Sequence, residues 1–459
     1  MDMETLKKNR MNTMQILALG FLGTILLGGA LLSLPICNQQ PITFSDALFT
    51  AVTAVCVTGL VTIVPATQFT LLGKIVLLIL IQIGGLGIIA CVTGFFVILR
   101  KRITVRERIM IQETYNMQGL SGMIAFVLRI LKGTFIIEGI GAVLYAFQFV
   151  PEYGWLKGIG YSIFHSVSAF CNAGIDILGN GSFVKYVNNP IVNFATMFLI
   201  IMGGIGFTVW YDVAHNCKIV REKKQSIKRM FTKLTLHSKI ALTMTGLMLV
   251  IGTLLVFVLE YHNPNTIGNM SIGDKLMSSA FHSVSTRTAG FATVSQSGLR
   301  PGTKFITTLW MFVGGSPGGT AGGIKTTTVA MLILTCLNVI YGKRDTECFG
   351  RKIPTENFRT GFSVVMVAFG FLLTGLTLLT VFEPKIDFLS LLYEAVSAIG
   401  TVGLTADVTP HLGTASKIVV MCMMYIGRLG PVTIALVFGT RKSRKERIRE
   451  LPEQRIMVG

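Results

Sequence analysis

Residues 49–60 read Phe-Thr-Ala-Val-Thr-Ala-Val-Cys-Val-Thr-Gly-Leu, and this pattern returns three more times along the chain. The other copies are Phe-His-Ser-Val-Ser-Ala-Phe-Cys-Asn-Ala-Gly-Ile at 164–175, Phe-His-Ser-Val-Ser-Thr-Arg-Thr-Ala-Gly-Phe at 281–291 and Tyr-Glu-Ala-Val-Ser-Ala-Ile-Gly-Thr-Val-Gly-Leu at 393–404. Their last glycines are 115, 116 and 113 residues apart in a chain of 459 residues. Such regular spacing predicts that one unit, repeated four times, builds the whole protein.

A second glycine motif follows each copy. It reads Ile-Gly-Gly-Leu-Gly-Ile at 83–88 and Met-Gly-Gly-Ile-Gly-Phe at 202–207, expands into the glycine-rich segment 313–323, and ends as Ile-Gly-Arg-Leu-Gly-Pro at 426–431. Two motifs in the same order in every unit strengthen the prediction of repeats. We divide the chain into repeats at 1–110, 111–230, 231–350 and 351–440, followed by a basic tail at 441–459.

The composition indicates a membrane protein. Hydrophobic residues make up 51% of the chain and charged residues 14%, whereas a soluble domain is roughly a quarter charged. Seven windows lack any Asp, Glu, Lys or Arg, namely 11–45, 47–73, 75–99, 186–211, 240–259, 305–324 and 360–382. Since about 20 apolar residues cross the hydrocarbon layer as a helix, we expect an all-α, multi-pass protein with eight spanning helices.

The net charge of +19 is concentrated in hydrophilic connections and termini. Five segments, 7–10, 100–108, 218–239, 343–359 and 441–455, hold 28 of the 41 basic residues. The positive-inside rule places these segments, and with them both termini, in the cytoplasm of a cell with this protein in its plasma membrane. Nucleic-acid binding is disfavoured, because each cluster adjoins a span and no aromatic residues interleave with the charges.

Each first motif begins with a helix too short to span the membrane. Residues 44–55 would form a helix of about 18 Å, so this helix must enter and return. Ser45 with Asp46, Asp274 and Asp387 offer N-caps for three of these pore helices. Irregular backbone at membrane depth is tolerated where it lines a water-filled path or is buried in protein. The expected fold is therefore four helix–pore-helix–helix units around one central pore.

The three residues that end at each aligned glycine form what we call a strip. The strips are Val57-Thr58-Gly59, Asn172-Ala173-Gly174, Thr288-Ala289-Gly290 and Thr401-Val402-Gly403. They carry no charge, so backbone carbonyls are the main groups that they offer an ion, and glycine can turn consecutive carbonyls toward an axis. Rings of carbonyls replace the hydration shell of potassium in potassium channels. The alternative is that these glycines only allow close helix packing.

Three basic residues fall inside apolar segments, where charge is costly and marks function by default. Arg287 precedes the third strip, and we expect it to brace the pore helix by bonding to carboxylates or carbonyls. Lys325 closes the segment 314–323, which has six glycines and a proline and cannot remain a regular helix. Arg428 lies in the last apolar segment.

The four-fold arrangement, the sequence Val-Ser-Thr-Arg-Thr-Ala-Gly-Phe at 284–291 and the glycine-rich segment together resemble the Trk/Ktr/HKT superfamily of potassium transporters. With one helix before the first pore helix, the chain is most similar to KtrB-type membrane subunits. The resemblance implies potassium translocation by a homodimer with one pore per protomer. It also implies a cytoplasmic KtrA-like ring of RCK domains that binds ATP, ADP or NAD(H), and, in many members, dependence on sodium.

The resemblance also assigns roles to residues. It implies that Gly59, Gly174, Gly290 and Gly403 set selectivity, and that four glycines favour potassium over sodium. It further implies that a loop below the strips obstructs the pore and faces an arginine. The matching gate residues are Gly314, Gly315, Gly318, Gly319, Gly322, Gly323, Lys325 and Arg428.

These observations predict inward potassium movement driven by the membrane potential, which contributes about 2.3 kcal/mol per charge per 100 mV. We do not expect an enzyme, since no nucleophile–base pair, metal cluster or complete phosphate loop is visible. Two rivals are a secondary transporter of an organic solute and a proton-coupled Trk-type symporter. The second would use a membrane carboxylate, for which Glu138 is the candidate, unless Glu138 pairs with Lys132 or faces a packed interior.

Overall fold

The computed structural model describes residues 13–101, 103–104, 107–109, 111–112, 122–179, 181–224, 226–343, 345–430 and 433. The basic clusters at 7–10 and 441–455, and the predicted tail at 441–459, lie outside the described residues. The described part is mostly helical. Its strands are the short antiparallel pair β1 (Glu347–Cys348) and β2 (Arg351–Lys352).

Each repeat contributes a long first helix, a short pore helix and a second helix, as predicted. The first helices are α1 (Thr13–Leu32), α7 (Met123–Tyr153), α12 (Leu236–Glu260) and α16 (Thr355–Phe382). The pore helices are α2 (Phe44–Cys56), α8 (Trp155–Phe170), α13 (Ile272–Ser285) and α17 (Phe388–Gly400). The second helices are α4 (Leu71–Leu86), α9 (Pro190–Ile205), α14 (Pro301–Phe312) and α18 (Thr414–Leu429).

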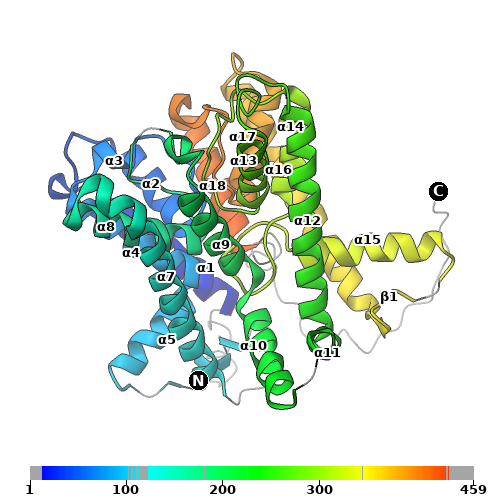
Figure 1. Ribbon diagram of the computed structural model, residues 1–459. Coiled ribbons are helices and arrows are strands. Elements are labelled where there is room, and N and C mark those ends of the chain that lie inside the picture. The colour runs from blue at the N-terminus through cyan, green and yellow to red at the C-terminus, as the bar shows by residue number, and fades with distance from the viewer. Residues whose placement is uncertain are drawn as a thin grey trace, which may run out of the picture.

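Shorter elements connect these helices. They are η2 (Pro35–Cys37), α3 (Pro65–Gln68), η3 (Val184–Tyr186), α11 (Ile227–Lys233) and η4 (Thr409–His411). Three segments continue the second helices after a break, namely α5 (Ile88–Ile98), α10 (Phe207–Glu222) and α15 (Thr326–Ile340). In Figure 1, α5 and α10 lie at the lower end of the bundle. Helix α15 projects to the right, and β1 lies below it.

The break predicted for the third repeat is present between α14 and α15, but two further breaks were not predicted. The chain bends by 103° between α4 and α5 and by 97° between α9 and α10. The bends fall at Gly87, with φ of 85°, and Gly206, with φ of 100°. A positive φ is incompatible with a continuing α-helix and is accessible to glycine. The second glycine motif is therefore a helix break in these repeats also.

The breaks change how the spans are built. By length and apolar composition, Met14–Leu32, α12 and α16 could each cross a membrane alone, and the two bent pairs could each count as one more span. The four second helices have only 12 to 16 residues each. The eight predicted spans are thus not eight continuous helices in the described residues.

Two of the predicted pore-helix caps are wrong by a few residues. The N-cap of α2 is Thr43, whose hydroxyl accepts from the Asp46 N–H, and the N-cap of α13 is Ser271, which does the same for Asp274. The acidic residue sits three positions later and accepts a hydrogen bond from the capping hydroxyl at 2.7 Å in each helix. Asp387 caps α17 as predicted.

The first and fourth repeats are joined by an ion pair near the N-terminal ends of α2 and α18. Lys417 on α18 donates to Asp46 on α2 at 2.7 Å, and both side chains are largely shielded from solvent. Asp46 also accepts from Thr62 at 2.8 Å. This contact closes the circle of four repeats.

Glu260, at the end of α12, is a fully buried carboxylate. It accepts hydrogen bonds from Asn263 at 2.6 Å, Thr266 at 2.7 Å, the Arg300 N–H at 3.0 Å and the Thr303 hydroxyl. It therefore ties α12 to α14 and to the loop between α12 and α13 within the third repeat.

We expect Glu260→Ala to lower the free energy of unfolding by about 3 kcal/mol or more, because several buried donors lose their acceptor. Thermal unfolding of the purified protein measures this effect. The control is Glu222→Ala, which breaks an exposed pair with Lys218 at 3.9 Å and should cost at most about 1 kcal/mol. Equal melting temperatures for the two variants would contradict the assignment.

Candidate ion pathway

All four strips have a positive φ at both their first residue and their glycine. Their first residues, Val57, Asn172, Thr288 and Thr401, have φ values of 54°, 58°, 63° and 51°, and their glycines have φ values of 102°, 65°, 78° and 90°. A side-chain-bearing residue in the left-handed region is uncommon and costs of order 1–3 kcal/mol. Its recurrence at four equivalent sites, including β-branched residues, shows that the surroundings impose this geometry.

The glycines of the four strips meet around one axis. A β-carbon on Gly59 would lie 2.7 Å from the carbonyl oxygen of Ala173, and one on Gly174 would lie 2.5 Å from that of Ala289. A β-carbon on Gly290 would lie 2.8 Å from the Val402 oxygen, and one on Gly403 would lie 2.0 Å from the Thr58 oxygen. Each glycine thus abuts the middle carbonyl of the next strip, and the fourth returns to the first. The ring is closed by backbone atoms alone.

One residue of each pore helix holds the adjacent strip in place by hydrogen bonds. This role was not predicted from the sequence. The residue lies four positions after the aligned aromatic residue and always bears a hydroxyl, as Thr53, Ser168, Ser285 and Ser397. Its carbonyl accepts from the middle N–H of the strip at 2.8 to 3.0 Å in all four repeats. The four repeats could have indicated this role, because a hydroxyl residue occupies this position in each of them.

The hydroxyl of this residue acts in two ways. Thr53 and Ser397 accept from the glycine N–H of their own strips at 2.9 and 3.0 Å. Ser168 and Ser285 instead donate to the carbonyl oxygens of Ile175 and Phe291. Both bonds hold the strip against its pore helix and leave the middle carbonyls near the axis.

We expect Ser397→Ala to reduce the preference for potassium over sodium by about threefold to tenfold. The substitution removes the acceptor of the Gly403 N–H, and the lost hydrogen bond is worth about 1 kcal/mol. Competition by sodium for rubidium uptake measures this preference. Ser397→Thr keeps the hydroxyl and should restore it. Identical selectivity in Ser397→Ala and the wild type would contradict the bracing role.

A cavity of about 440 Å³, here called the outer cavity, lies on the side of the ring away from residues 314–325. The four strip glycines line it together with Asp176 and Asp407. Both acids closely follow strip glycines, Gly174 and Gly403, and sequence reasoning had not selected them. Two carboxylates in a funnel raise the local concentration of cations.

Residues 314–325, here called the inner loop, fill the other side of the ring. A β-carbon on Gly322 would lie 2.0 Å from the hydroxyl of Thr401, and one on Gly314 would lie 3.2 Å from the Thr288 side chain. Gly323 approaches the Gly400 carbonyl, and Gly315 packs against Ala321. The loop backbone therefore lies directly beneath the strips, and side chains at Gly314, Gly315 and Gly322 would not fit.

Backbone hydrogen bonds join the inner loop to the helix break between α9 and α10 in the second repeat. The Ser316 N–H donates to the Gly204 oxygen at 2.9 Å, and the Thr320 N–H donates to the Gly203 oxygen at 3.1 Å. In return, the Phe207 N–H donates to the Gly318 oxygen at 2.9 Å. A β-carbon on Gly319 would meet the Gly203 oxygen at 2.7 Å. Sequence reasoning gave no sign of this pairing between repeats.

Asn172 connects the inner loop with the strips. Its side-chain oxygen accepts from the Thr320 hydroxyl at 3.3 Å, and its amide donates to the Arg287 carbonyl at 3.3 Å and the Thr288 hydroxyl at 3.4 Å. The Thr320 hydroxyl also donates to the Phe170 carbonyl at 3.0 Å. Among the four strips in the described structure, the second is the one whose side chain bonds directly to the loop.

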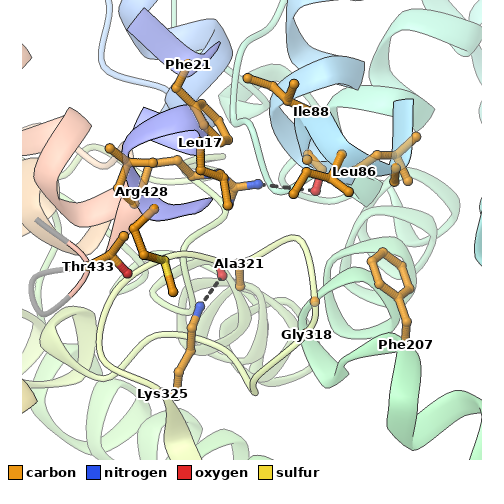
Figure 2. Close-up of a pocket in the computed structure, with 17 residues that line it drawn as sticks. Leu17, Phe21, Leu86, Ile88, Phe207, Gly318, Ala321, Lys325, Arg428 and Thr433 are labelled. Carbon is orange, nitrogen blue, oxygen red and sulfur yellow. Dashed lines mark hydrogen bonds between the residues drawn. The ribbon is translucent and has the colours of Figure 1, made fainter. Parts of the chain in front are cut away.

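Arg428 and Lys325 line an inner cavity of about 250 Å³. Arg428 donates to the carbonyl oxygens of Thr320 and Gly84, and to that of Gly85 at 3.2 Å. Lys325 donates to the Ala321 oxygen at 2.7 Å. Figure 2 shows the two side chains approaching the cavity from different elements, Arg428 beside Leu17 and Leu86, and Lys325 beside Ala321. Arg428 thus joins α18 to the inner loop and α4.

Arg287 is buried behind the third strip, but its side-chain partner differs from the expected one. Its guanidinium donates to the hydroxyl of Thr245 on α12 at 3.1 Å, and its Nε has no hydrogen-bond partner in the described structure. The predicted carboxylate or carbonyl acceptors are not used, because α12 presents a threonine at this depth. Arg287 still connects the third strip with the outer helix of its own repeat.

Glu138 does not pair with Lys132 in the described structure. It is buried on α7 and accepts from the Gln82 amide on α4 at 3.0 Å. Cys171, which precedes the second strip, lies 4.0 Å from the same carboxyl oxygen. Glu138 therefore lies beside the second strip, between repeats one and two.

Comparison with known proteins identifies the family to which this chain belongs. Residues 8–446 match the TrkH family, described as cation transport proteins. The chain belongs to the TrkH family. Because this family consists of cation transporters, the prediction of a transporter rather than an enzyme is confirmed, as is a multi-pass membrane protein.

Relatives within the TrkH family cover the full length. The chain is 39% identical over 456 residues to Ktr system potassium uptake protein B of Bacillus subtilis (strain 168), covering 99% of both chains. It is 37% identical to potassium/sodium uptake protein NtpJ of Enterococcus hirae, covering 98% of both. The crystal structure of the potassium transporter TrkH from Vibrio parahaemolyticus has the same fold, with a TM-score of 0.71, 18% identity, and coverage of 94% of this chain and 86% of that one. The predicted fold class and the resemblance to KtrB-type subunits are confirmed.

Proposed function

We propose that this protein takes up potassium through the ring of strip carbonyls. The observation that carries the proposal is the closed circle in which each strip glycine abuts the middle carbonyl of the next strip. Converging carbonyls replace the hydration shell of a monovalent cation, and the outer carboxylates supply cations to the ring. The strip residues 57–59, 172–174, 288–290 and 401–403 form the filter of this pathway, and the membrane potential drives the ion inward.

The inner loop and Arg428 form the gate. The loop backbone lies directly under the strips, and the guanidinium adds a positive charge on the inner side, which repels a cation. Release requires the bonds from Arg428 and Asn172 to the loop to break. The six loop glycines supply the freedom for such a movement.

The remaining parts of the proposal rest on the likeness to Ktr proteins. The protein acts as a homodimer of four-repeat protomers in the bacterial plasma membrane, with both termini and the basic connections in the cytoplasm. There it meets a KtrA-like RCK ring that binds ATP, ADP or NAD(H), so the nucleotide acts on the partner. Sodium acts as a second ion, in keeping with the name of the Enterococcus hirae relative.

Growth of a potassium-uptake-deficient bacterium tests the proposal. Cells that express this chain with a matching regulatory subunit should grow at low potassium. Absence of growth, with the protein present in the membrane, would overturn the potassium assignment and favour a transporter of another solute.

Liposome flux decides the coupling. Purified protein should move rubidium under an electrical potential alone, with sodium altering the rate. A strict requirement for a proton gradient that disappears in Glu138→Gln would instead favour the proton-coupled symporter, because Glu138 is a buried carboxylate beside the second strip.

A further inference from the structure

The inner cavity is lined by two basic side chains and, among the described residues, by no acidic one. The two basic residues are Arg428 and Lys325. Neither side chain forms an ion pair in the described part of the chain. Charges at membrane depth are costly unless they are compensated. Hydrogen bonds to backbone carbonyls compensate only part of the cost of burying these two side chains.

Both side chains retain donors that could hold a ligand. An arginine has five N–H donors and a lysine has three. Arg428 uses its two terminal nitrogens for three carbonyl oxygens, and Lys325 contacts the Ala321 oxygen at 2.7 Å and the Gly322 oxygen at 3.5 Å. At least one N–H on each residue therefore remains for a further acceptor.

The break in the first repeat adds backbone donors to the same cavity. Helix α5 begins at Ile88, and its first residues, Ile88, Ile89 and Ala90, line the cavity together with Arg428. In the first turn of a helix these N–H groups have no intrahelical acceptor, and they form no backbone hydrogen bond to another element of the described structure. The N-terminal end of a helix carries a partial positive charge and binds anions. Two side-chain cations and an open helix start thus converge on one space.

We propose that this cavity binds a small inorganic anion, with chloride as the simplest case. The anion contacts Arg428, Lys325 and the first turn of α5. It bridges α18, α5 and the end of the inner loop, so it stabilises the arrangement in which the loop lies beneath the strips. Binding itself does not depend on the proposed potassium pathway. Its consequence, that internal anion reduces cation flux, does rest on that proposed function.

Anomalous scattering from crystals of the full chain grown in potassium bromide tests the site. We expect a bromide peak in the cavity between Arg428, Lys325 and Ile88. Bromide at surface positions with none in this cavity would overturn the proposal. Added phosphate should weaken the peak if the site also accepts phosphate. An unchanged peak would restrict the site to monovalent halides.

Line broadening of chloride-35 NMR on the purified protein measures affinity in solution. Lys325→Met should weaken chloride binding by about tenfold or more, corresponding to loss of a charge-assisted hydrogen bond of about 1.5 kcal/mol. Lys325→Arg keeps the charge and should retain binding, which separates charge loss from misfolding. The matched control is Lys385→Met, an exposed lysine outside the cavity. Equal affinity in Lys325→Met and the control would contradict the site.

Rubidium flux into liposomes tests the consequence. Flux should rise when chloride on the inner-loop side is replaced by gluconate, which is too large to share the contacts of chloride. Equal flux in the two anions would overturn the regulatory role. If no cation flux occurs at all, the potassium proposal fails, while the bromide peak still decides whether the anion site exists.

Discussion

Gly403→Ala should lower potassium uptake by about two orders of magnitude. Its β-carbon would lie 2.0 Å from the Thr58 oxygen and 2.8 Å from the Gly59 α-carbon, and both contacts are with backbone. The residue also has φ of 90°, which an alanine adopts only at a cost. Overpacking and strain together cost about 3 kcal/mol, which corresponds to roughly a hundredfold. Initial rates of rubidium uptake in potassium-depleted cells measure the change.

The matched control for this variant is Gly370→Ala on α16, in the same repeat. A β-carbon there would meet no atom within 4 Å, so uptake should stay at the wild-type level. Membrane abundance and melting temperature show whether each variant folds. A Gly403→Ala protein that folds and transports at the wild-type rate would rule out a tight backbone ring at this position.

Arg428→Ala should raise cation flux by about tenfold and make it less dependent on the regulatory subunit. The substitution removes a positive charge from the inner cavity and breaks the hydrogen bonds that join α18 to the Thr320, Gly84 and Gly85 carbonyls. Removal of about 1.4 kcal/mol from the barrier gives a tenfold rate. Rubidium flux into liposomes with and without the regulatory subunit measures both effects.

Deletion of residues 316–320 should act in the same direction, because it removes the part of the inner loop that is bonded to Gly203, Gly204 and Asn172. Arg359→Ala is the matched control for Arg428→Ala. This arginine lies in the same repeat as Arg428 and is exposed near the start of α16. Unchanged flux in both Arg428→Ala and the deletion would refute the gate.

The repeat pattern was sufficient to predict the architecture. Four copies of a short apolar helix followed by a glycine indicated pore helices and strips, and these elements are present near the predicted positions. The prediction worked because residues at membrane depth have few structural options. The glycine-rich segment was likewise recognisable as a helix break, since glycine and proline are poor helix formers.

Contacts between repeats could not be predicted in the same way. The pairing of Ser316 and Thr320 with the second repeat depends on backbone groups of glycines, which leave no sequence signature. The bends at Gly87 and Gly206 were missed because glycines in an apolar helix can also serve close helix packing. The Arg287 partner, Thr245, lies 42 residues earlier and belongs to no recognised motif.

The central claim is that an ion occupies the axis of the glycine ring, and anomalous scattering from crystals containing rubidium tests it most directly. We predict a rubidium peak among the middle carbonyls of the strips, those of Thr58, Ala173, Ala289 and Val402. Rubidium bound in the outer cavity or elsewhere, with no density between the four strips, would contradict the account.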